Sequence, residues 1–198
     1  LKSTVALPNK KINVVYRSGS SGTTQNFARF LMGNGASGYK DNGTWATASA
    51  QSTPTGVSAA NAQAVVTTVS TTANSIGYAD LSDAASKGLS FAALRNPLGE
   101  FVKPSVAAAS KFLAVQPVKA NGILDIDYKK SVKGGYNASL VTYALAPTAQ
   151  GGAKGTAIRK FLTYVINSCA PAKGPAMNYA PLAAALKAKA LKLVATVK

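Results

Sequence analysis

A chain of 198 residues, with 47% hydrophobic and 14% charged residues, is long enough to bury a core and too apolar to be disordered. It has 22 Lys and Arg residues but 6 Asp and Glu residues, which give a net charge of +16. With no histidine, one cysteine and few acids, the composition excludes Ser-His-Asp and Cys-His sets and any metal-ligand cluster. The positive charge favours an anionic partner, which could be nucleic acid, an anionic surface or a small anion.

Predicted strands and helices alternate along the chain. Short apolar runs between turn residues indicate strands, and apolar residues at helical spacing indicate helices. In the first half we expect a strand at 12–16, a helix at 23–32, an irregular connection at 33–55, a helix at 57–71, a strand at 75–78 and a helix at 80–87. In the second half we expect a strand at 89–94, a helix at 105–113, a strand at 139–147 and helices at 156–167 and 182–194. This alternation predicts an α/β sheet protein.

Two other patterns could suggest an enzyme, but each has a simpler interpretation. Ser37 and Lys40 have the serine–lysine spacing of some acyl enzymes, yet they lie in a loop rich in Gly and Asn and not at a helix start. Asp125 and Asp127 alternate along one edge, which favours a solvated face over an acid pair. The predicted loop is long enough to be functional, with Trp45 as its anchor. We therefore expect a protein that is not an enzyme and that uses no cofactor or metal.

The ends of the chain and its one cysteine give indications of the compartment in which the protein resides. We find neither a signal peptide nor an apolar run long enough to span a bilayer. Because Leu1 is not a start residue, we expect a processed amino terminus or a part of a longer chain. Cys169 cannot form an internal disulfide, and we interpret it as a half-buried apolar residue. Pairing with a cysteine outside this segment is the alternative.

The stretch "NVVYRSGSSGTTQNFARFL", residues 13–31, predicts an anion cradle. A strand that ends in a Ser/Gly-rich turn and opens a helix directs several backbone N–H groups to one place, and the helix dipole adds positive potential there. Glycine allows close approach of the backbone, hydroxyl groups add donors, and Arg17 supplies a planar fork for an oxyanion. No lysine follows the glycines, so this is not a Walker loop. An ordinary capped helix after a serine-rich turn is the alternative.

The segment "RSGSSGTTQNF" resembles the phosphate-binding motif of the periplasmic PstS-type phosphate-binding proteins. The similarity continues in order along nearly the whole chain, through "LPNKKINVVYRS", "GVSAANAQAVVTTVSTTANSIGYADLSDAA", "NPLGEFVKP" and "NYAPLAAALKAKA". This resemblance implies a periplasmic-binding-protein-like (type II) two-lobed α/β fold, of which the chain contains the second lobe and the return segment of the first. Residues 1–137 would form the second lobe, and residues 138–198 the return segment.

The resemblance also implies a role for each residue of the motif. Arg17 would pair with phosphate oxygens, Ser21 would donate its hydroxyl, and the amides of Gly22 and Thr23 with the Thr23 hydroxyl would complete this side of the site. The neighbours that would support them are Ser18, Gly19 and Ser20. Gly19 replaces the family's acid, which normally holds the arginine, so Arg17 should be more mobile or should use an acceptor from elsewhere.

The family's amino-terminal portion is missing from this sequence. In the family it supplies the opposing wall of the site, with a Thr, a Ser and an Asp that accepts the phosphate's proton. The chain should therefore carry about half of a site, and the missing segment would be one of its partners.

The function implied by the resemblance is phosphate binding outside the cytoplasmic membrane for uptake through an ABC permease. The protein would be periplasmic or extracellular and associated with the cell surface. The alternative is a surface or structural protein that reuses the fold, with a relaxed or lost anion site. Polyanion binding through the net charge is a third hypothesis, and nucleic acid is not expected because the lysines are scattered and not interleaved with aromatic residues.

Overall fold

The computed structural model describes residues 6, 8–149 and 151–197, which form two compact units. The first unit contains the residues up to Arg29 together with residues 37–89, and the second contains residues 30–36 and those from Ser90 onward. The two lobes predicted from the sequence, 1–137 and 138–198, refer to a longer two-lobed protein and stay a prediction.

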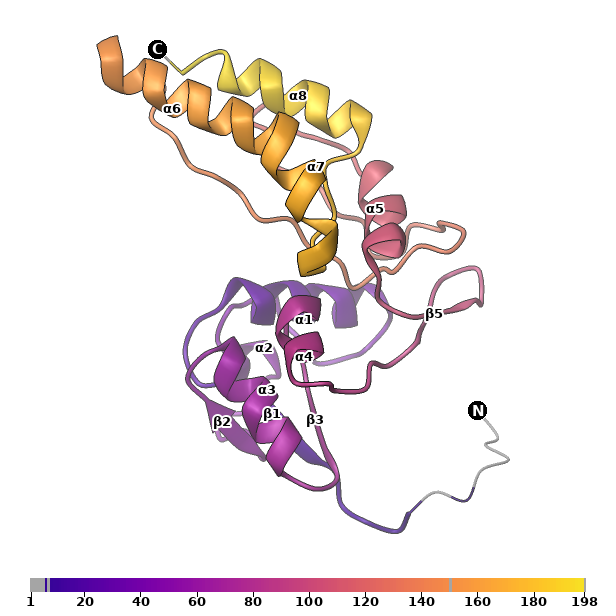
Figure 1. Cartoon of the computed structure of the whole chain (residues 1–198). Helices are drawn as coiled ribbons and strands as arrows, with labels where there is room; N and C mark the ends of the chain where they lie inside the picture. Colours follow the sequence, from indigo (N-terminus) through magenta and orange to yellow (C-terminus); the bar gives the residue numbers. More distant parts are fainter. Residues whose placement is uncertain (1–5, 7, 150, 198) are drawn as a thin grey trace. The chain divides into compact units, whose positions relative to one another are not determined.

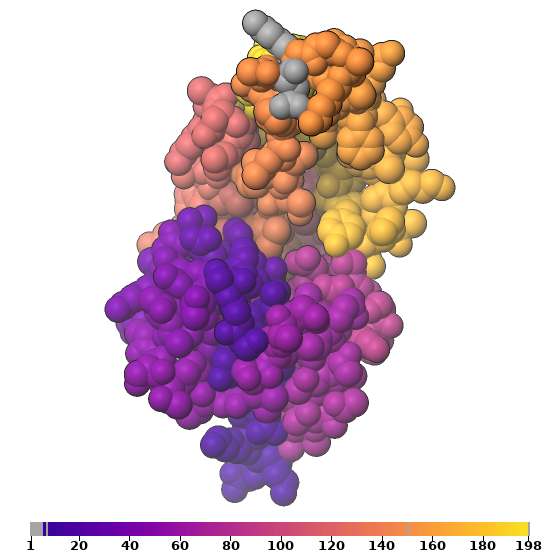
Figure 2. All heavy atoms as spheres, turned by 90° about the vertical axis from the view of Figure 1, so that its left-hand side faces the viewer, coloured from indigo at the N-terminus to yellow at the C-terminus, as the bar shows by residue number. Residues whose placement is uncertain are grey.

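The first unit is built on a parallel sheet of three short strands (Figure 1). Its elements are β1 (Asn13–Arg17), most of α1 (Gly22–Gly33), α2 (Trp45–Ala48), β2 (Val57–Ala59), α3 (Ala62–Thr71), β3 (Ser75–Gly77) and α4 (Leu81–Ser86). The strand order is β2-β1-β3, so β1 lies in the centre. In the space-filling view, early residues of this unit (indigo) lie between purple and magenta atoms from later in the chain (Figure 2). The predicted α/β fold class is confirmed.

Successive side chains of β1 point to opposite faces of the sheet, because side chains alternate along a strand with a period of two residues. Val15 is completely buried and packs with Ala59 of β2 and Val65 of α3, so α3 covers that face. Tyr16 contacts an aromatic cluster instead, and its ring stacks on Trp45 with centroids 6.2 Å apart. The predicted anchor role of Trp45 is confirmed, since only 7% of this residue is exposed.

The predicted helix over residues 57–71 is wrong in its first part. Val57–Ala59 form β2, which pairs in parallel with the carboxyl end of β1. The helix α3 begins only after Asn61, whose side chain accepts a hydrogen bond from the Ala64 N–H and caps the first turn. Gly56 precedes the strand at φ 126°, and a Cβ there would collide with the Val14 carbonyl oxygen. Glycine is therefore required where the chain enters β2.

The second unit combines a small hairpin with several helices. Its elements are β4 (Leu94–Arg95), β5 (Phe101–Val102), α5 (Val106–Ala114), α6 (Gly152–Tyr164), the π-helix η1 (Val165–Cys169), α7 (Ala170–Lys173), the 3-10 helix η2 (Pro175–Met177) and α8 (Ala184–Val194). The Phe112 side chain is completely buried and its ring stacks on Tyr128. In Figure 1, α6 and α8 lie side by side, and they are in contact.

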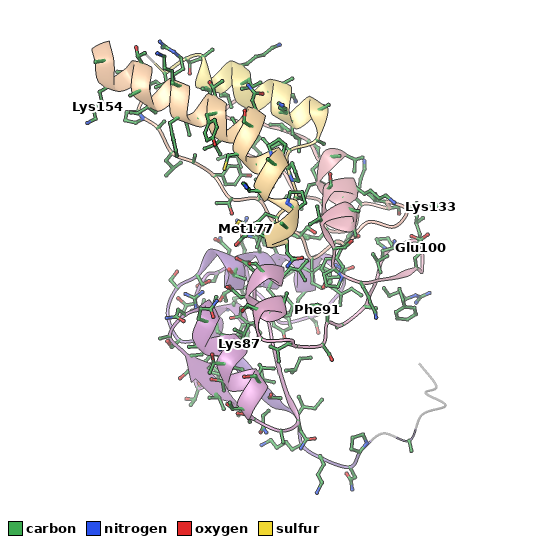
Figure 3. All side chains as sticks on the ribbon, in the orientation of Figure 1. Lys87, Phe91, Glu100, Lys133, Lys154 and Met177 are labelled. Atoms are coloured by element: carbon green, nitrogen blue, oxygen red, sulfur yellow. The ribbon has the colours of Figure 1, made fainter. Side chains whose placement is uncertain are left out.

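Buried polar side chains organise the loops of the second unit. The Asn96 side chain accepts the N–H groups of Leu98 and Glu100, which closes the turn between β4 and β5. The Gly134 N–H and the Asn96 amide donate to the Glu100 carboxylate and lower its pKa, with a smaller effect from the charge of Lys133. Glu100 and Lys133 lie in the same part of this unit (Figure 3).

Two predicted strands of the second unit are wrong. In place of a strand at 89–94, only Leu94 and Arg95 form a strand, which pairs with β5 in antiparallel fashion. Residues 139–147 have no regular secondary structure and no strand pairing, although they are apolar enough for a strand. A strand needs a neighbour to satisfy its N–H and C=O groups, and the described part of the chain places none beside this segment. Leu145 is consequently 95% exposed.

The remaining predicted helices are confirmed, with shifted bounds. Ser105 is the N-cap of α5 and accepts the Ala108 N–H through its hydroxyl. The helix predicted at 156–167 begins earlier and continues into the π-helix that contains Cys169, which is half-buried and free. Asp125 and Asp127 are exposed, as expected for a solvated face. Within the described part of the chain, every helix is too short or too polar to cross a bilayer.

Candidate anion-binding site

The site predicted from the sequence lies at the edge of the sheet where the parallel strands end. Arg17 is the last residue of β1 and is in register with Ala59, the last residue of β2. Tyr78 follows the end of β3 directly. Open α/β sheets bind ligands beyond the carboxyl ends of their strands, so this edge is where a ligand is expected.

Arg17 is held at this edge through both its backbone and its side chain. Its backbone N–H donates to the Tyr78 hydroxyl over 3.2 Å. Its guanidinium Nη1 donates to the Ser21 Oγ over 3.1 Å, which joins the end of β1 to the start of α1. The Arg17 Nε is buried and has no hydrogen-bond acceptor among the described residues. Part of the guanidinium is therefore left unsatisfied by the protein.

Ser21 precedes α1 and acts at its amino terminus. The Thr24 N–H donates to the Ser21 Oγ over 3.5 Å, a long capping contact. The Ser21 N–H donates to the Gly43 carbonyl over 2.9 Å, so this amide is not free for a ligand. The N–H groups of Gly22 and Thr23 begin the helix and have no acceptor within it, and the helix dipole places positive potential beside them. The first turn of α1 can thus accept an anion.

The three supporting residues occupy the turn between β1 and α1. Ser18 continues the pairing with β2, because its N–H donates to the Ala59 carbonyl over 2.9 Å. Gly19 and Ser20 are exposed. Gly43 approaches this turn so closely that a Cβ there would lie 2.7 Å from the Ser20 Oγ. The structure thus brings all seven predicted residues together at one junction, and their binding roles stay predictions.

Sequence reasoning missed three residues beside this junction. Thr24 is completely buried, and its hydroxyl lies 2.7 Å from the Tyr78 hydroxyl. The Tyr78 ring stacks on Phe27 with centroids 4.8 Å apart. Asp80 is half-buried after β3, and burial raises the pKa of its carboxyl, as does the charge of Asp83, while the charge of Arg17 acts in the opposite direction. The "IGY" strand was a landmark of the resemblance, but nothing local indicated that it touches Arg17.

Comparison with known proteins identifies the class of this fold. A family model described as a PBP superfamily domain matches residues 3–168, and the chain belongs to this superfamily. Its homologues are PstS phosphate-binding proteins. The resemblance seen in the sequence is therefore confirmed.

Two relatives show how far the similarity extends. Phosphate-binding protein PstS of Xylella fastidiosa (strain Temecula1) is 37% identical over 112 residues, which are 52% of this chain and 29% of the relative. Phosphate-binding protein PstS 2 of Mycobacterium tuberculosis (strain H37Rv) is 30% identical over 175 residues, which are 84% of this chain and 46% of the relative. The chain thus spans less than half the length of these relatives.

A solved structure supports the same fold. The chain matches a high-affinity periplasmic phosphate-binding protein, PfluDING, solved with bound phosphate, with a TM-score of 0.65 and 24% sequence identity. The match covers 90% of this chain and 56% of that protein. The periplasmic-binding-protein-like fold is therefore shown over most of the chain, and these relatives are named as phosphate-binding proteins.

Proposed function

We propose that this chain contributes one wall of a phosphate site in an extracytoplasmic binding protein that supplies an ABC permease. The observation that carries the proposal is the contact of Arg17 with Ser21 at the start of α1, which assembles a guanidinium, hydroxyl groups and helix amides at one sheet edge. The relatives named for phosphate binding support the choice of ligand. A periplasmic or extracellular location, at the cell surface, follows from this role.

The chemistry of the edge suits a tetrahedral oxyanion. In the proposed complex Arg17 and Ser21 each donate to a phosphate oxygen, and the N–H groups of Gly22 and Thr23 point at the same ligand from the helix end. The Thr23 hydroxyl, in the first turn of α1, completes this wall. Hydrogen bonds to a charged ligand are each worth about 1.5–3 kcal/mol, which makes a few well-placed donors sufficient for specific binding.

A titration of the chain with inorganic phosphate tests the proposal, with amide chemical shifts in NMR spectra as the readout. We expect saturable binding that persists at moderate salt. The shift changes should be confined to the turn between β1 and α1. Binding of polyanions through the net charge of +16 would instead weaken steeply as salt rises. Shift changes spread over the lysine-bearing surfaces would contradict a defined phosphate site.

The substitution Gly19→Asp is expected to tighten phosphate binding by about 1 kcal/mol, the size of one charge-assisted hydrogen bond. A Cβ at Gly19 meets open space, so the new side chain fits without moving the turn. Its carboxylate can accept from the unpaired Arg17 Nε and fix the guanidinium before the ligand arrives, which reduces the entropy lost on binding. We expect this ordering to outweigh repulsion of the anion.

Phosphate affinities of the parent and Gly19→Asp proteins, measured side by side at low salt, check this prediction because surface charges are screened least there. The matched control is Gly19→Asn, which has nearly the same shape without the charge. Weaker binding of the aspartate variant would show that the site has been rebuilt around glycine, and would favour a ligand other than phosphate.

A further inference from the structure

The loop between α1 and α2 contacts the anion turn (residues 18–21, between β1 and α1) through a backbone hydrogen bond. The Gly43 carbonyl accepts the Ser21 N–H over 2.9 Å. Ser21 is also the residue whose hydroxyl accepts from the Arg17 guanidinium over 3.1 Å and caps the first turn of α1. The loop therefore fixes the main chain of the residue that joins Arg17 to the helix.

Gly43 packs directly against the anion turn. A Cβ at this position would lie 2.7 Å from the Ser20 Oγ and 3.2 Å from the Ser21 carbonyl oxygen. The φ of Gly43 is not positive, so its backbone conformation is open to other residues. Glycine is therefore required here by the close approach of the loop, and not by the backbone conformation.

The Asp41 carboxylate attaches the loop to α1. Its Oδ1 accepts a hydrogen bond from the Gln25 Nε2 over 2.7 Å and another from the Arg29 Nε over 2.8 Å. Gln25 and Arg29 are four residues apart and so lie on the same face of the helix. The hydrogen bond from Arg29 is the main cause of a lowered pKa of Asp41, which partial burial opposes and the hydrogen bond from Gln25 reinforces. The carboxylate is therefore ionised at neutral pH.

Trp45 fixes the other end of the same segment. It is buried, and its ring stacks on Tyr16 of β1 with centroids 6.2 Å apart. Between Asp41 and Trp45, the Asn42 Oδ1 accepts the Thr44 N–H over 2.8 Å, which closes a tight turn. The carbonyl that contacts the anion turn belongs to the residue inside this turn, so its position is determined from both sides.

We infer that the segment Asp41–Trp45 is a clasp that holds the anion turn in the arrangement that binds phosphate. Gly43 fixes the Ser21 main chain, and Asp41 keeps Gly43 in place from α1. Both are positioning residues, because they act on the anion through Ser21. The inference rests on the proposed phosphate site, and it makes the affinity of that site depend on an ion pair between the loop and α1.

The charge of Asp41 and its positioning role affect anion binding in opposite directions. Removing a carboxylate from the first unit would by itself favour an anion, because like charges repel each other. A clasp that orders Ser21 before the ligand arrives reduces the entropy lost on binding, so a loosened clasp weakens binding. Weaker binding by Asp41→Asn could therefore not come from the lost charge. The ion pair is about half exposed, with side-chain exposures of 45% and 46%, so its loss should cost little stability.

The experiment compares Asp41→Asn and Gly43→Ala with the parent chain, and Asp125→Asn is the matched control. Asp125 also pairs with a cation at the surface, Lys119 at 3.6 Å, but it belongs to the second unit. The affinity for inorganic phosphate, the urea unfolding midpoint and the hydrogen-exchange rate of the Ser21 amide without ligand are measured for each protein. The exchange rate reports on the hydrogen bond to Gly43, because an amide exchanges when its hydrogen bond opens.

We expect Asp41→Asn to weaken phosphate binding about threefold and to accelerate exchange of the Ser21 amide about fivefold. Gly43→Ala should weaken binding about tenfold and accelerate this exchange at least as much, because the new Cβ forces the loop away from the turn. Asp125→Asn should leave both quantities within about 1.5-fold of the parent. A merely structural role of the clasp would lower the unfolding midpoint and leave the affinity of the folded protein unchanged.

If the parent binds phosphate and Asp41→Asn binds it as tightly or more tightly, the inference is overturned while the proposed function stands. Weaker binding without faster Ser21 exchange would also overturn it, since the effect would not pass through Gly43. If the parent binds no phosphate, the proposed function fails, and the Ser21 exchange rates decide the inference. Faster exchange in Asp41→Asn and Gly43→Ala, but not in Asp125→Asn, supports the clasp, and equal rates contradict it.

Discussion

Replacing Arg17 by alanine is expected to weaken phosphate binding by about 100-fold or more, because two charge-assisted hydrogen bonds of about 1.5–3 kcal/mol each are lost. Arg17 contributes the only guanidinium at the sheet edge within the described part of the first unit, and its Nη1 already lies 3.1 Å from Ser21. Lysine could keep the charge but not the planar fork, so Arg17→Lys should recover only part of the loss.

Lys119→Ala is the matched control, since it removes the same charge from a different place. Lys119 belongs to the second unit, is more than half exposed and pairs with Asp125 at 3.6 Å. Such surface pairs contribute little, so this variant should bind phosphate nearly as the parent does. Calorimetric or NMR titrations of both variants give the comparison. Equal losses would mean that diffuse positive charge, and not a defined cradle, attracts the anion.

The location of the candidate site could be predicted because its parts are close in the sequence. A strand, a turn of small residues and a helix follow one another between Asn13 and Gly33, so local geometry alone brings Arg17 near Ser21. Tyr78 and Asp80 could not be found this way. The Tyr78 hydroxyl reaches the Arg17 N–H only because β3 pairs in parallel beside β1, and that pairing depends on the whole sheet.

The errors in the fold have the same origin. Val57–Ala59 is too short to show a strand pattern and runs into the helical pattern of α3, so only its pairing with β1 reveals it as a strand. Residues 139–147 illustrate the reverse case. Their apolar pattern is typical of a strand, but a strand without a neighbour cannot satisfy its backbone, and the structure shows irregular, largely exposed chain. Secondary structure that depends on distant partners is what the sequence pattern predicts least well.

The exposed apolar residues of the second unit bear on how much of a binding protein this chain provides. Leu145, Phe161 and Tyr164 are 95%, 63% and 59% exposed. Leu145 lies on the unpaired segment, and Phe161 and Tyr164 lie on α6, within the region predicted to return to the first lobe. Apolar side chains exposed in this way are suited to cover by further chain. We therefore expect the amino-terminal portion that the family resemblance implies to pack here.

This expectation leads to a test of the half-site. Alone, the chain should bind phosphate with a Kd on the order of 1 mM, because an open wall leaves the ligand largely hydrated. Extended at its amino terminus by the corresponding portion of a PstS relative, it should bind about 1,000-fold more tightly, since added donors on the opposing wall contribute about 4 kcal/mol together.

The comparison requires phosphate affinity and cooperative unfolding of both proteins, because a fusion that fails to fold would bind weakly for an unrelated reason. The fused chain should also unfold at a higher urea concentration, since its added lobe would cover Leu145 and the neighbouring apolar residues.

Two further variants of the fusion distinguish phosphate binding from packing of the added lobe. Arg17→Ala should still abolish tight binding, whereas Leu145→Ser should lower the stability and leave the affinity of the folded protein nearly unchanged. Equal phosphate affinity of the folded fusion and the 198-residue chain would show that the site is already complete here, and would contradict the proposal that it is one wall of a larger cleft.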